Sequence, residues 1–475
     1  MLFSSTVFLF VFLPSVIFAY YVLLKKSRLL QNIFLLCVSL VFYAWGEPKF
    51  VLIMILSIIV NWALGITAAK FRDRKLKGRA VIAAAAVFNI GLMFIFKYLM
   101  FTIENINNIF GTSIFVPLIT LPIGISFFTF QAFSYVIDVF RNNGEMQKNP
   151  LNVGLYISFF PQLIAGPIVR YQTVADEIKN RKETLADFVS GVERFIVGFL
   201  KKVMIANSMA VIADAAFDSK DAVSASFAWL GAAAYTFQIF FDFAGYSDMG
   251  IGLGRMFGFH FLENFNYPYV SKSVTEFWRR WHISLGTWFR DYVYFPLGGS
   301  RVDSKARLVF NLFTVWLLTG IWHGANWTFL VWGFMYFAVL TIEKLTGIPQ
   351  KKGKLINLLK YVFTMLTVVF GWVIFRSDSM GAACGYFKAM FGASGAGLMP
   401  GETVFYLKNN IVMFAAAVAF SLPTAPFVRK KIQSSGKAAQ RTSSALYTAA
   451  LFLLFIVAVS YMIKGSYNPF IYFNF

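Results

Sequence analysis

The 475-residue sequence is 58% hydrophobic and only 14% charged, and its formal net charge is +21. A water-soluble chain of this length could not cover so many apolar side chains, so that class is excluded. Apolar runs long enough to cross about 30 Å of hydrocarbon recur throughout, and they are too long for the strands of a β-barrel. We predict one all-α polytopic membrane domain over residues 1–475, with about 11 transmembrane helices plus re-entrant and interfacial helices.

The positive charge fits a membrane protein better than a nucleic-acid-binding protein. Lysines and arginines gather in short connections such as "KKSR" and "KFRDRKLKGR". The positive-inside rule describes this pattern, and no nucleic-acid-binding motif accompanies it. The two cysteines, Cys37 and Cys384, lie in or near apolar segments and indicate neither a disulfide framework nor a metal site.

Five apolar runs open the chain, over residues 2–24, 29–46, 49–69, 80–101 and 113–139. The first run lacks the basic start of a signal peptide, and its positive charge follows it, so we predict an uncleaved span. The connections alternate between basic and non-basic. This alternation predicts an N-terminus outside the cell membrane and basic loops in the cytoplasm.

A broken apolar segment follows, "LNVGLYISFFPQLIAGPIVRY" (151–171). Pro161, Gly166 and Pro167 interrupt it, and basic residues flank it on both sides. Because both flanks resemble cytoplasmic loops, we predict a re-entrant hairpin. Broken backbone at membrane depth is tolerated where protein buries it or where it lines a cavity.

The next apolar helix, at about 185–217, carries two adjacent lysines, Lys201 and Lys202. We place this pair at the inner interface, with the stems of the side chains snorkelling along the helix. A span at about 225–245 comes next and ends in "FDFAGYSDMG".

The stretch "FWRRWHISLGTWFRDYVYFPLGGSR" (277–301) combines arginines, aromatic residues and His282. Read as one helix, it has an apolar stripe and a polar stripe with His282 at their border. Two interpretations stay open, an interfacial helix with aromatic anchors and the polar wall of a cytoplasmic opening whose arginines suit phosphate or carboxylate. The apolar stripe is Trp278, Trp281, Leu285, Trp288 and Tyr292, and the polar stripe is Arg280, Ser284, Thr287 and Asp291.

Residues 309–342 are almost wholly apolar but contain "TGIWHGANW". The run is too long for one span and short for two, and both flanks are basic. We therefore predict two short helices that meet within the membrane, with His323 near their junction. The last spans are expected at about 358–375, 410–427 and 444–463, which puts the C-terminus outside. The sequence shows no repeat of the kind common in transporters.

The chain contains three histidines, His260, His282 and His323. A histidine at membrane depth is a functional candidate, so His323 is either a general base in a water-poor tunnel or a buried imidazole bonded to a freed carbonyl. His260 lies in a loop, where a structural role is favoured. A metal site built from His282, His323 and Asp248 lacks the usual ligand motifs and is set aside.

Several long segments resemble the membrane-bound O-acyltransferase family, in the branch of the alginate O-acetyltransferase membrane subunit. They include "EFWRRWHISLGTWFRDYVYFPLGG", "GIWHGANWTFLVWG", "FFPQLIAGPIVRY" and "YTFQIFFDFAGYSDMGIGLGRMFGFHFLENFNYPY". The resemblance covers nearly the whole chain in the expected order. The related D-alanyl transferase of teichoic acid synthesis shares the "RWH" and "WHG" signatures and is the weaker match.

The resemblance implies a ring of helices around a central funnel, with re-entrant segments. It implies that His323 is the family's essential histidine and His282 its second characteristic histidine. With the chemistry of the residue types, it suggests two further groups. Asn326, Trp322, Asp248 and Trp281 would support a substrate tunnel, and Arg279, Arg280, Arg290, Lys201 and Lys202 would bind the acyl donor.

The resemblance also implies a reaction and its partners. No cofactor is bound permanently, and acetyl-CoA is the expected donor substrate. The acyl group would pass across a bacterial cell membrane toward an exported polysaccharide, with an extracytoplasmic hydrolase-like protein and the polysaccharide synthesis machinery as partners. His260 and Leu262 depart from the family pattern, where Arg and Pro are expected, which puts a phosphate role at His260 in doubt.

Three alternatives stay open. The chain could transfer D-alanine to teichoic acid, transport a glycan or lipid carrier, or act as a non-catalytic scaffold of a synthesis complex. The sequence does not name the polymer.

Overall fold

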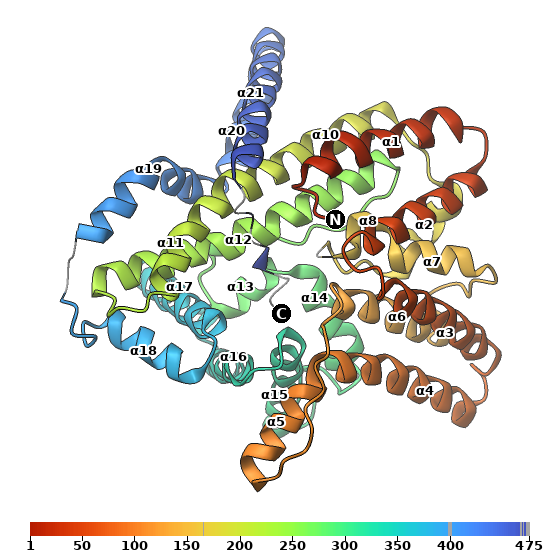
Figure 1. The fold of residues 1–475 in the computed structure, drawn as a ribbon, viewed down its shortest axis with the longest axis horizontal. Coiled ribbons are helices and arrows are strands. Elements are labelled where there is room, and N and C mark those ends of the chain that lie inside the picture. Colours follow the sequence, from red (N-terminus) through yellow and green to blue (C-terminus); the bar gives the residue numbers. More distant parts are fainter. Residues whose placement is uncertain (165, 398–400, 466–467, 469, 472–475) are drawn as a thin grey trace. The chain divides into compact units, whose positions relative to one another are not determined.

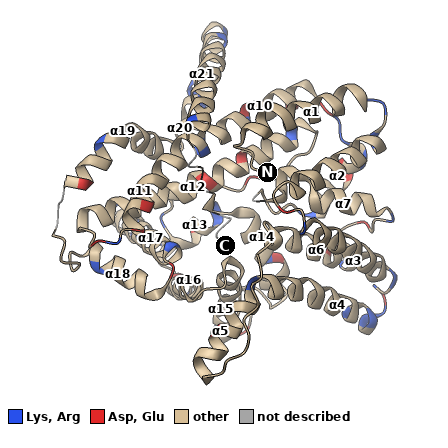
Figure 2. Ribbon diagram, viewed as in Figure 1, with Lys and Arg blue, Asp and Glu red and all other residues tan. Residues whose placement is uncertain are grey.

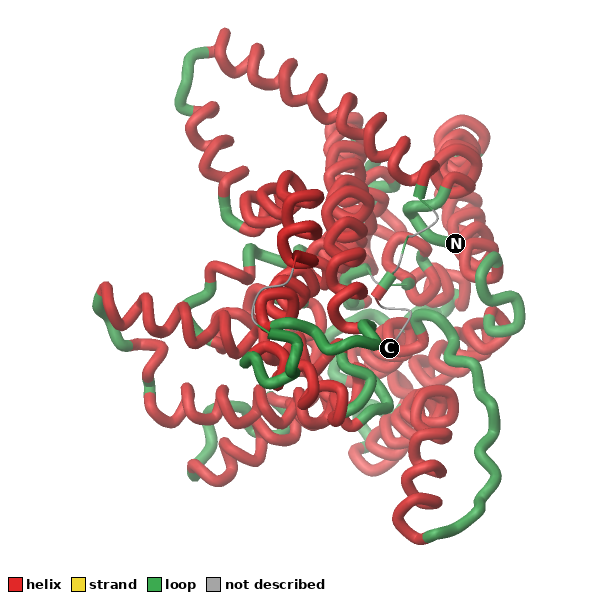
Figure 3. Tube along the Cα trace, turned by 60° about the vertical axis from the view of Figure 1, so that its left-hand side comes forward, coloured by secondary structure: helices red, strands yellow, loops and turns green. Residues whose placement is uncertain are grey.

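The computed structural model describes residues 1–475 except 165, 398–400, 466–467, 469 and 472–475. Helices joined by loops make up this described part, and no strand occurs within it (Figure 3). Among the described residues, seven helices are long and apolar enough to cross a membrane, and three shorter apolar helices accompany them. The prediction of an all-α polytopic membrane protein is confirmed. The seven are Val51–Lys70, Lys75–Phe110, Leu185–Phe217, Trp327–Thr346, Lys354–Arg376, Gly401–Ser421 and Lys437–Lys464, and the shorter three are Phe8–Leu23, Arg28–Ala44 and Ile125–Phe140.

The chain forms two compact units that alternate along the sequence. Unit 1 comprises residues 1–195 and 246–262, and unit 2 comprises residues 196–245 and 263–475. The long helix α12 (Ala225–Met256) contributes residues to both. Whether the two units act as the single predicted domain stays a prediction.

Unit 1 is built on close contacts between helices α3 (Val51–Lys70), α4 (Lys75–Met93) and α6 (Ile125–Phe140), which lie together in Figure 1. The buried amides of Asn61 and Asn89 join α3 to α4, donating to each other's Oδ1 at 3.1 and 2.8 Å. Figure 2 shows lysines and arginines gathered where the chain turns from α3 into α4, as expected of a basic loop. The remaining helices of this unit are α1 (Leu13–Phe18), α2 (Arg28–Ala44), α5 (Leu99–Phe110), α7 (Pro150–Ser158), α8 (Phe160–Leu163), α9 (Tyr171–Asn180) and α10 (Leu185–Leu200), the last of which ends in unit 2.

Two predicted spans of unit 1 have different limits in the structure. The run at 80–101 lies inside a continuous helix, Lys75–Phe110, that passes through a π-helical turn at Phe94–Tyr98. The run at 113–139 is helical only from Ile125, after Gly124 in the left-handed region at φ +73°. Two prolines precede this start, and proline removes the backbone donor that a helix interior needs.

The broken segment is present where the sequence predicted it. Helix α7 ends at Ser158, Phe159 adopts a non-helical conformation, and the short helix α8 follows. The hydroxyl of Ser39 accepts a hydrogen bond from the backbone N–H of Phe160 at 3.0 Å, so protein satisfies a backbone group at the break. The interruption is confirmed, and the re-entrant path in the membrane stays a prediction.

Unit 2 surrounds a core dominated by aromatic side chains. Trp332 and Trp372 are fully buried there, together with Tyr336. Aromatic rings of this kind bury large areas and favour edge-to-face contacts. The helices of this unit are α11 (Asn207–Phe217), α13 (Val274–Arg280), α14 (Ile283–Phe289), α15 (Lys305–His323), α16 (Trp327–Thr346), α17 (Lys354–Arg376), α18 (Met380–Met390), α19 (Gly401–Ser421), α20 (Thr424–Gln433) and α21 (Lys437–Lys464), with π-helical turns at Lys201–Ala206 and Arg290–Tyr294.

Helices α15 and α16 form a hairpin whose backbones touch at two glycines. A Cβ added at Gly320 would lie 2.6 Å from the carbonyl oxygen of Phe329, and one at Gly333 would lie 2.6 Å from that of Trp316. The predicted junction beside His323 is confirmed. The prediction that both helices are short is wrong. Helices α15 and α16 extend beyond the apolar run and are 19 and 20 residues long.

We expect Gly333→Ala to destabilise the folded chain by about 1–3 kcal/mol, because the methyl group must push α16 away from α15. Gly385→Ala is the matched control. Gly385 lies in helix α18 with no atom within 4 Å of an added Cβ. There, alanine should stabilise by up to about 1 kcal/mol through its higher helix propensity. Thermal unfolding midpoints of the full chain in detergent measure both, and equal shifts for the two variants would contradict the close approach.

Candidate active site

His282 lies at a break between two short helices. Helix α13 ends at Arg280, α14 begins at Ile283, and His282 itself has a left-handed backbone with φ 44° and ψ 53°. The predicted single helix over 277–301, with its two continuous stripes, is therefore wrong. Left-handed backbone costs a non-glycine residue roughly 1–2 kcal/mol, so other contacts must compensate. One is the hydrogen bond from the backbone N–H of Ile283 to the carbonyl of Asn264, at 2.9 Å.

The side chain of Asn264 fixes the protonation of His282. The Oδ1 atom of Asn264 accepts from the backbone N–H of Ser284 at 3.2 Å, which identifies that atom as the oxygen. His282 Nδ1 lies 3.2 Å from the same oxygen and must therefore donate to it. His282 is 2% exposed, and burial lowers its pKa to about 3. The imidazole is neutral, and its lone pair is on Nε2.

A cavity of about 570 Å³ adjoins this break. Its lining includes His282, Arg279 and Arg290. Trp281 and Trp288 are 3% and 4% exposed, so these rings pack inside the protein and do not anchor an interfacial helix. The burial of these rings favours the other interpretation of this stretch, in which it forms the polar wall of an opening. Arg280 is not part of the lining and pairs with Glu276 at 2.9 Å.

His323 is the last residue of α15 and is enclosed by aromatic rings. It is 5% exposed. Its ring centroid lies 5.0 Å from those of Trp322 and Trp332 and 5.1 Å from that of Phe375. These neighbours come from α15, α16 and α17. Such an enclosure keeps bulk water away from the imidazole.

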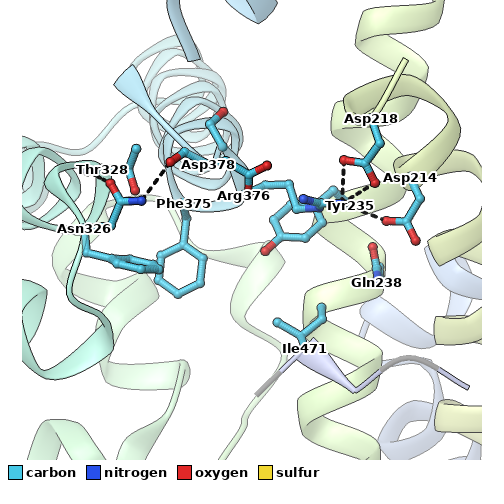
Figure 4. A pocket seen from close by; sticks show the side chains of 12 residues that line it. Asp214, Asp218, Tyr235, Gln238, Asn326, Thr328, Phe375, Arg376, Asp378 and Ile471 are labelled. Carbon is cyan, nitrogen blue, oxygen red and sulfur yellow. Dashed lines mark hydrogen bonds and ion pairs between the residues drawn. The ribbon is translucent and has the colours of Figure 1, made fainter. Parts of the chain in front are cut away.

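A second cavity, of about 380 Å³, is lined by residues that include Asn326, Phe375 and Arg376 (Figure 4). Phe375 belongs to its lining and also contacts His323. Toward the first cavity, the ring of His282 lies 6.0 Å from that of Trp322, the neighbour of His323. Phe375 thus connects His323 to the wall of the second cavity, and Trp322 connects it to His282 in the wall of the first.

Asn326 caps helix α16 and lines the second cavity. Its side-chain oxygen accepts from the backbone N–H of Thr328 at 3.1 Å, and its amide donates to the carbonyl of Asp378 at 2.8 Å. Figure 4 shows the second of these bonds. Its support of a base or an oxyanion stays a prediction, as does that of Trp322.

Lys202 does not snorkel to an interface, and that prediction is wrong. Its side chain is 2% exposed and pairs with Asp242 at 2.6 Å. The other oxygen of Asp242 accepts from the backbone N–H of Ile471 at 2.9 Å, and Ile471 lines the second cavity. A buried amine needs such a partner, because the membrane core offers no counter-charge. Lys201 beside it is only partly buried.

Two residues that the sequence analysis considered, Asp248 and His260, belong to unit 1. Asp248 pairs with Arg194 at 2.6 Å. His260 lies on an exposed loop and contacts Glu177 at 2.8 Å and Asp187 at 3.4 Å, which agrees with the structural role favoured for it. Among the residues that the structure describes, no group of three histidine, cysteine or acidic side chains is placed to hold a metal ion.

Several residues of the site were missed in the sequence. Asn264 lies in the quoted segment "FGFHFLENFNYP" but carries no motif of its own. Arg376 directly follows the span predicted at about 358–375 and is the last residue of helix α17. Asp214 and Asp218 are one helical turn apart near the end of the helix predicted at about 185–217. The four-residue spacing of the two carboxylates was the one available signal.

Comparison with known proteins identifies the family. Residues 141–375 match the model of the membrane-bound O-acyltransferase family, MBOAT. The whole chain aligns at 40% identity with the whole of a probable alginate O-acetylase AlgI from Azotobacter vinelandii. The chain belongs to the membrane-bound O-acyltransferase family.

Two further relatives are less similar to this chain. The whole chain is 31% identical to a peptidoglycan O-acetyltransferase of Helicobacter pylori, covering 98% of that protein. About half of the chain, 53%, is 32% identical to a teichoic acid D-alanyltransferase of Bacillus subtilis, covering 68% of it. This membrane-bound O-acyltransferase therefore matches the O-acetyl-transferring relatives over its full length.

We expect Lys202→Met to destabilise the acyltransferase by about 3–5 kcal/mol, because Asp242 would keep a buried charge without its partner. Adding Asp242→Asn removes both charges and retains an acceptor for Ile471, so the double variant should recover most of that loss. Lys201→Met serves as the neighbouring control, with a smaller effect. Detergent unfolding midpoints measure all three, and equal losses from Lys201 and Lys202 would contradict the buried pair.

The stability of unit 1 should depend on pH through His260. Burial lowers the pKa of His260, but hydrogen bonds with Glu177 and Asp187 outweigh burial and raise it above the ordinary value. A raised pKa favours the charged folded form, so this stabilisation is complete below about pH 6.5 and lost as the pH rises through the raised pKa. Because the pair is half exposed, His260→Gln should cost at most about 1 kcal/mol at pH 6 and nothing at pH 9. An equal loss of unfolding free energy in His260→Gln at pH 6 and at pH 9 would contradict a stabilising charge on His260.

Proposed function

We propose that this O-acyltransferase takes an acetyl group from cytoplasmic acetyl-CoA and passes it across the membrane to O-acetylate an exported polysaccharide. One observation carries the proposal: the ring of His323 contacts Phe375, which lines the second cavity, and Trp322, whose ring lies 6.0 Å from that of His282 in the first. The names of the full-length relatives, an alginate O-acetylase and a peptidoglycan O-acetyltransferase, support an acetyl group and a polysaccharide.

The donor would bind in the cavity of about 570 Å³, which adjoins His282. Arg279 and Arg290 line it, and guanidinium groups bind phosphates through paired, charge-assisted hydrogen bonds. Arg280 and Lys202 are less suited to this role, because neither lines this cavity. Arg290 does line it, although its Nε also donates to Asp291 at 2.8 Å. No permanently bound cofactor takes part in the proposed reaction.

The acceptor hydroxyl would attack the carbonyl carbon of the thioester, forming a C–O ester bond and breaking the C–S bond. His323 would accept the hydroxyl proton and return a proton to the departing thiolate, which leaves as free CoA. The aromatic enclosure of His323 would limit competing hydrolysis by water. His282, neutral with its proton on Nδ1, would shape the donor side.

The orientation follows from the charge of the loops. Basic connections, such as the one between α3 and α4, would face the cytoplasm, with both termini outside the bacterial cell membrane. The proposed partners are the lipid bilayer, an extracytoplasmic hydrolase-like acetyltransferase and the polysaccharide synthesis machinery.

We expect His323→Gln to lower acetyl transfer by at least about 100-fold, because a general base contributes about 10²–10⁴-fold. Transfer of radiolabelled acetyl from acetyl-CoA to cell-surface polysaccharide, in membranes that contain equal amounts of each protein, measures this. His260→Gln is the matched control and should keep full activity.

Three outcomes would contradict the proposal. Normal acetylation by the His323→Gln variant would remove His323 from the reaction. Transfer of D-alanine in place of acetyl would favour the teichoic acid branch. A native chain that neither binds nor consumes acetyl-CoA but moves a glycan carrier would be a transporter.

A further inference from the structure

The side-chain oxygen of Asn264 accepts hydrogen bonds from three donors. These are the backbone N–H of Ser284 at 3.2 Å, the hydroxyl of Ser284 at 2.9 Å and Nδ1 of His282 at 3.2 Å. The Ser284 hydroxyl lies 3.4 Å from Nδ1 but gives its single hydrogen to Asn264, so it does not compete for the role of acceptor. A buried donor that loses its acceptor is costly, and the orientation of the imidazole therefore depends on this one oxygen.

Asn264 also holds the backbone that carries the imidazole. Its carbonyl accepts from the N–H of Ile283 at 2.9 Å, and its side chain accepts from the N–H of Ser284. Both bonds reach the first turn of α14, directly after His282. The same residue thus fixes the left-handed backbone of His282 and the direction of its ring.

The other neighbours of the ring place it at the wall of the 570 Å³ cavity. The ring centroid of Phe243, on α12, lies 4.6 Å away in an edge-on contact, and that of Trp322, on α15, lies 6.0 Å away. His282 belongs to the lining of the cavity, and the charged groups that share this lining are Arg279 and Arg290. Because Nδ1 is turned toward Asn264, the nitrogen that can serve an occupant of the cavity is Nε2.

Several polar side chains of this lining can only donate hydrogen bonds. The guanidinium groups of Arg279 and Arg290 and the indole of Trp278 have hydrogens to give and no acceptor atom. Such groups suit the phosphates and carbonyls of an acyl donor, whereas an N–H of the same donor needs an acceptor. In a CoA thioester, the N–H nearest the reacting carbon belongs to the amide two methylene groups from the sulfur. A neutral imidazole with its lone pair on Nε2 is a fitting acceptor for it.

We infer that Asn264 is a positioning residue of the acyl transfer, which keeps the proton of His282 on Nδ1 so that Nε2 accepts a hydrogen bond from the amide N–H beside the thioester. This rests on the proposed function, because it takes acetyl-CoA as the occupant of the cavity. Asn264 does not itself line the cavity and acts through His282. The bonds made and broken in the reaction are unchanged.

The native chain tests the tautomer without any substitution at the site. ¹⁵N NMR of the full-length protein in lipid vesicles, with ring-labelled histidine in the His260→Gln background, leaves the signals of two imidazoles, and His323→Gln assigns them. We expect His282 to be neutral at pH 6 with hydrogen on Nδ1. An imidazolium, or hydrogen on Nε2, would overturn the inference.

A matched pair of donors tests the hydrogen bond. One is acetyl-CoA, and the other is its analogue with an ester oxygen in place of the amide N–H nearest the sulfur. Acetyl transfer to cell-surface polysaccharide, in membranes with equal amounts of each protein, should proceed with a kcat/KM at least about 5-fold higher for the amide, as expected for the loss of one buried hydrogen bond. The difference should lie mainly in KM.

Asn264→Leu keeps the approximate size of the side chain and removes the oxygen. The Nδ1–H form of His282 should then no longer be the single species, and the preference for the amide donor should fall below about 2-fold. A merely structural defect would lower transfer from both donors equally and leave their ratio unchanged. Asn266→Leu is the matched control, because Asn266 is exposed on the same loop, and it should keep the native ratio.

Each result decides between the inference and the proposed function. Equal kcat/KM for the two donors in the native chain, or an unchanged preference in Asn264→Leu, would overturn the inference and leave the proposed function intact. If Asn264→Leu does not fold, the native donor ratio and the native tautomer still decide the inference. Absence of transfer from acetyl-CoA by the native chain would overturn the proposed function and this inference with it.

Discussion

The contact between the backbones of helices α15 and α16 is the constraint on which the site depends. Gly320 and Gly333 let the two helices approach until their atoms touch. This approach brings Trp332 and Phe329 to the end of α15, where His323 lies. A larger residue at either glycine would widen the gap and loosen the rings that keep water from the imidazole. The packing of two helices thus sets the chemical environment of one side chain.

The polar groups of this apolar chain are held by partners that lie far away in the sequence. Asn264 compensates the helix break at His282 and fixes the proton on its Nδ1. Asp242 neutralises Lys202 and also holds the backbone of Ile471 at the wall of a cavity. Each arrangement satisfies a group that neither water nor lipid can reach, which is the general requirement for polar atoms within a membrane protein.

Local sequence signals predicted the features that local chemistry decides. Glycine and asparagine mark the junction after His323, and the prolines around residue 161 mark the break between α7 and α8, so both were predictable. The break at His282 was not, because helical spacing continues through Trp281 and the contacts that stabilise the break come from Asn264, 18 residues earlier. The lining of the 380 Å³ cavity comes from five separate stretches of the chain, and no periodicity connects them.

The two cavities beside His323 differ in charge, and this difference gives the proposed reaction a direction. Arginines line the one that would hold the phosphates of acetyl-CoA, whereas the other has an excess of carboxylates. A polyphosphate donor is attracted to the first and repelled from the second, so only its acyl group has reason to pass His323. Charge would therefore keep the phosphates of the donor on one side of the imidazole while the acyl group passes it.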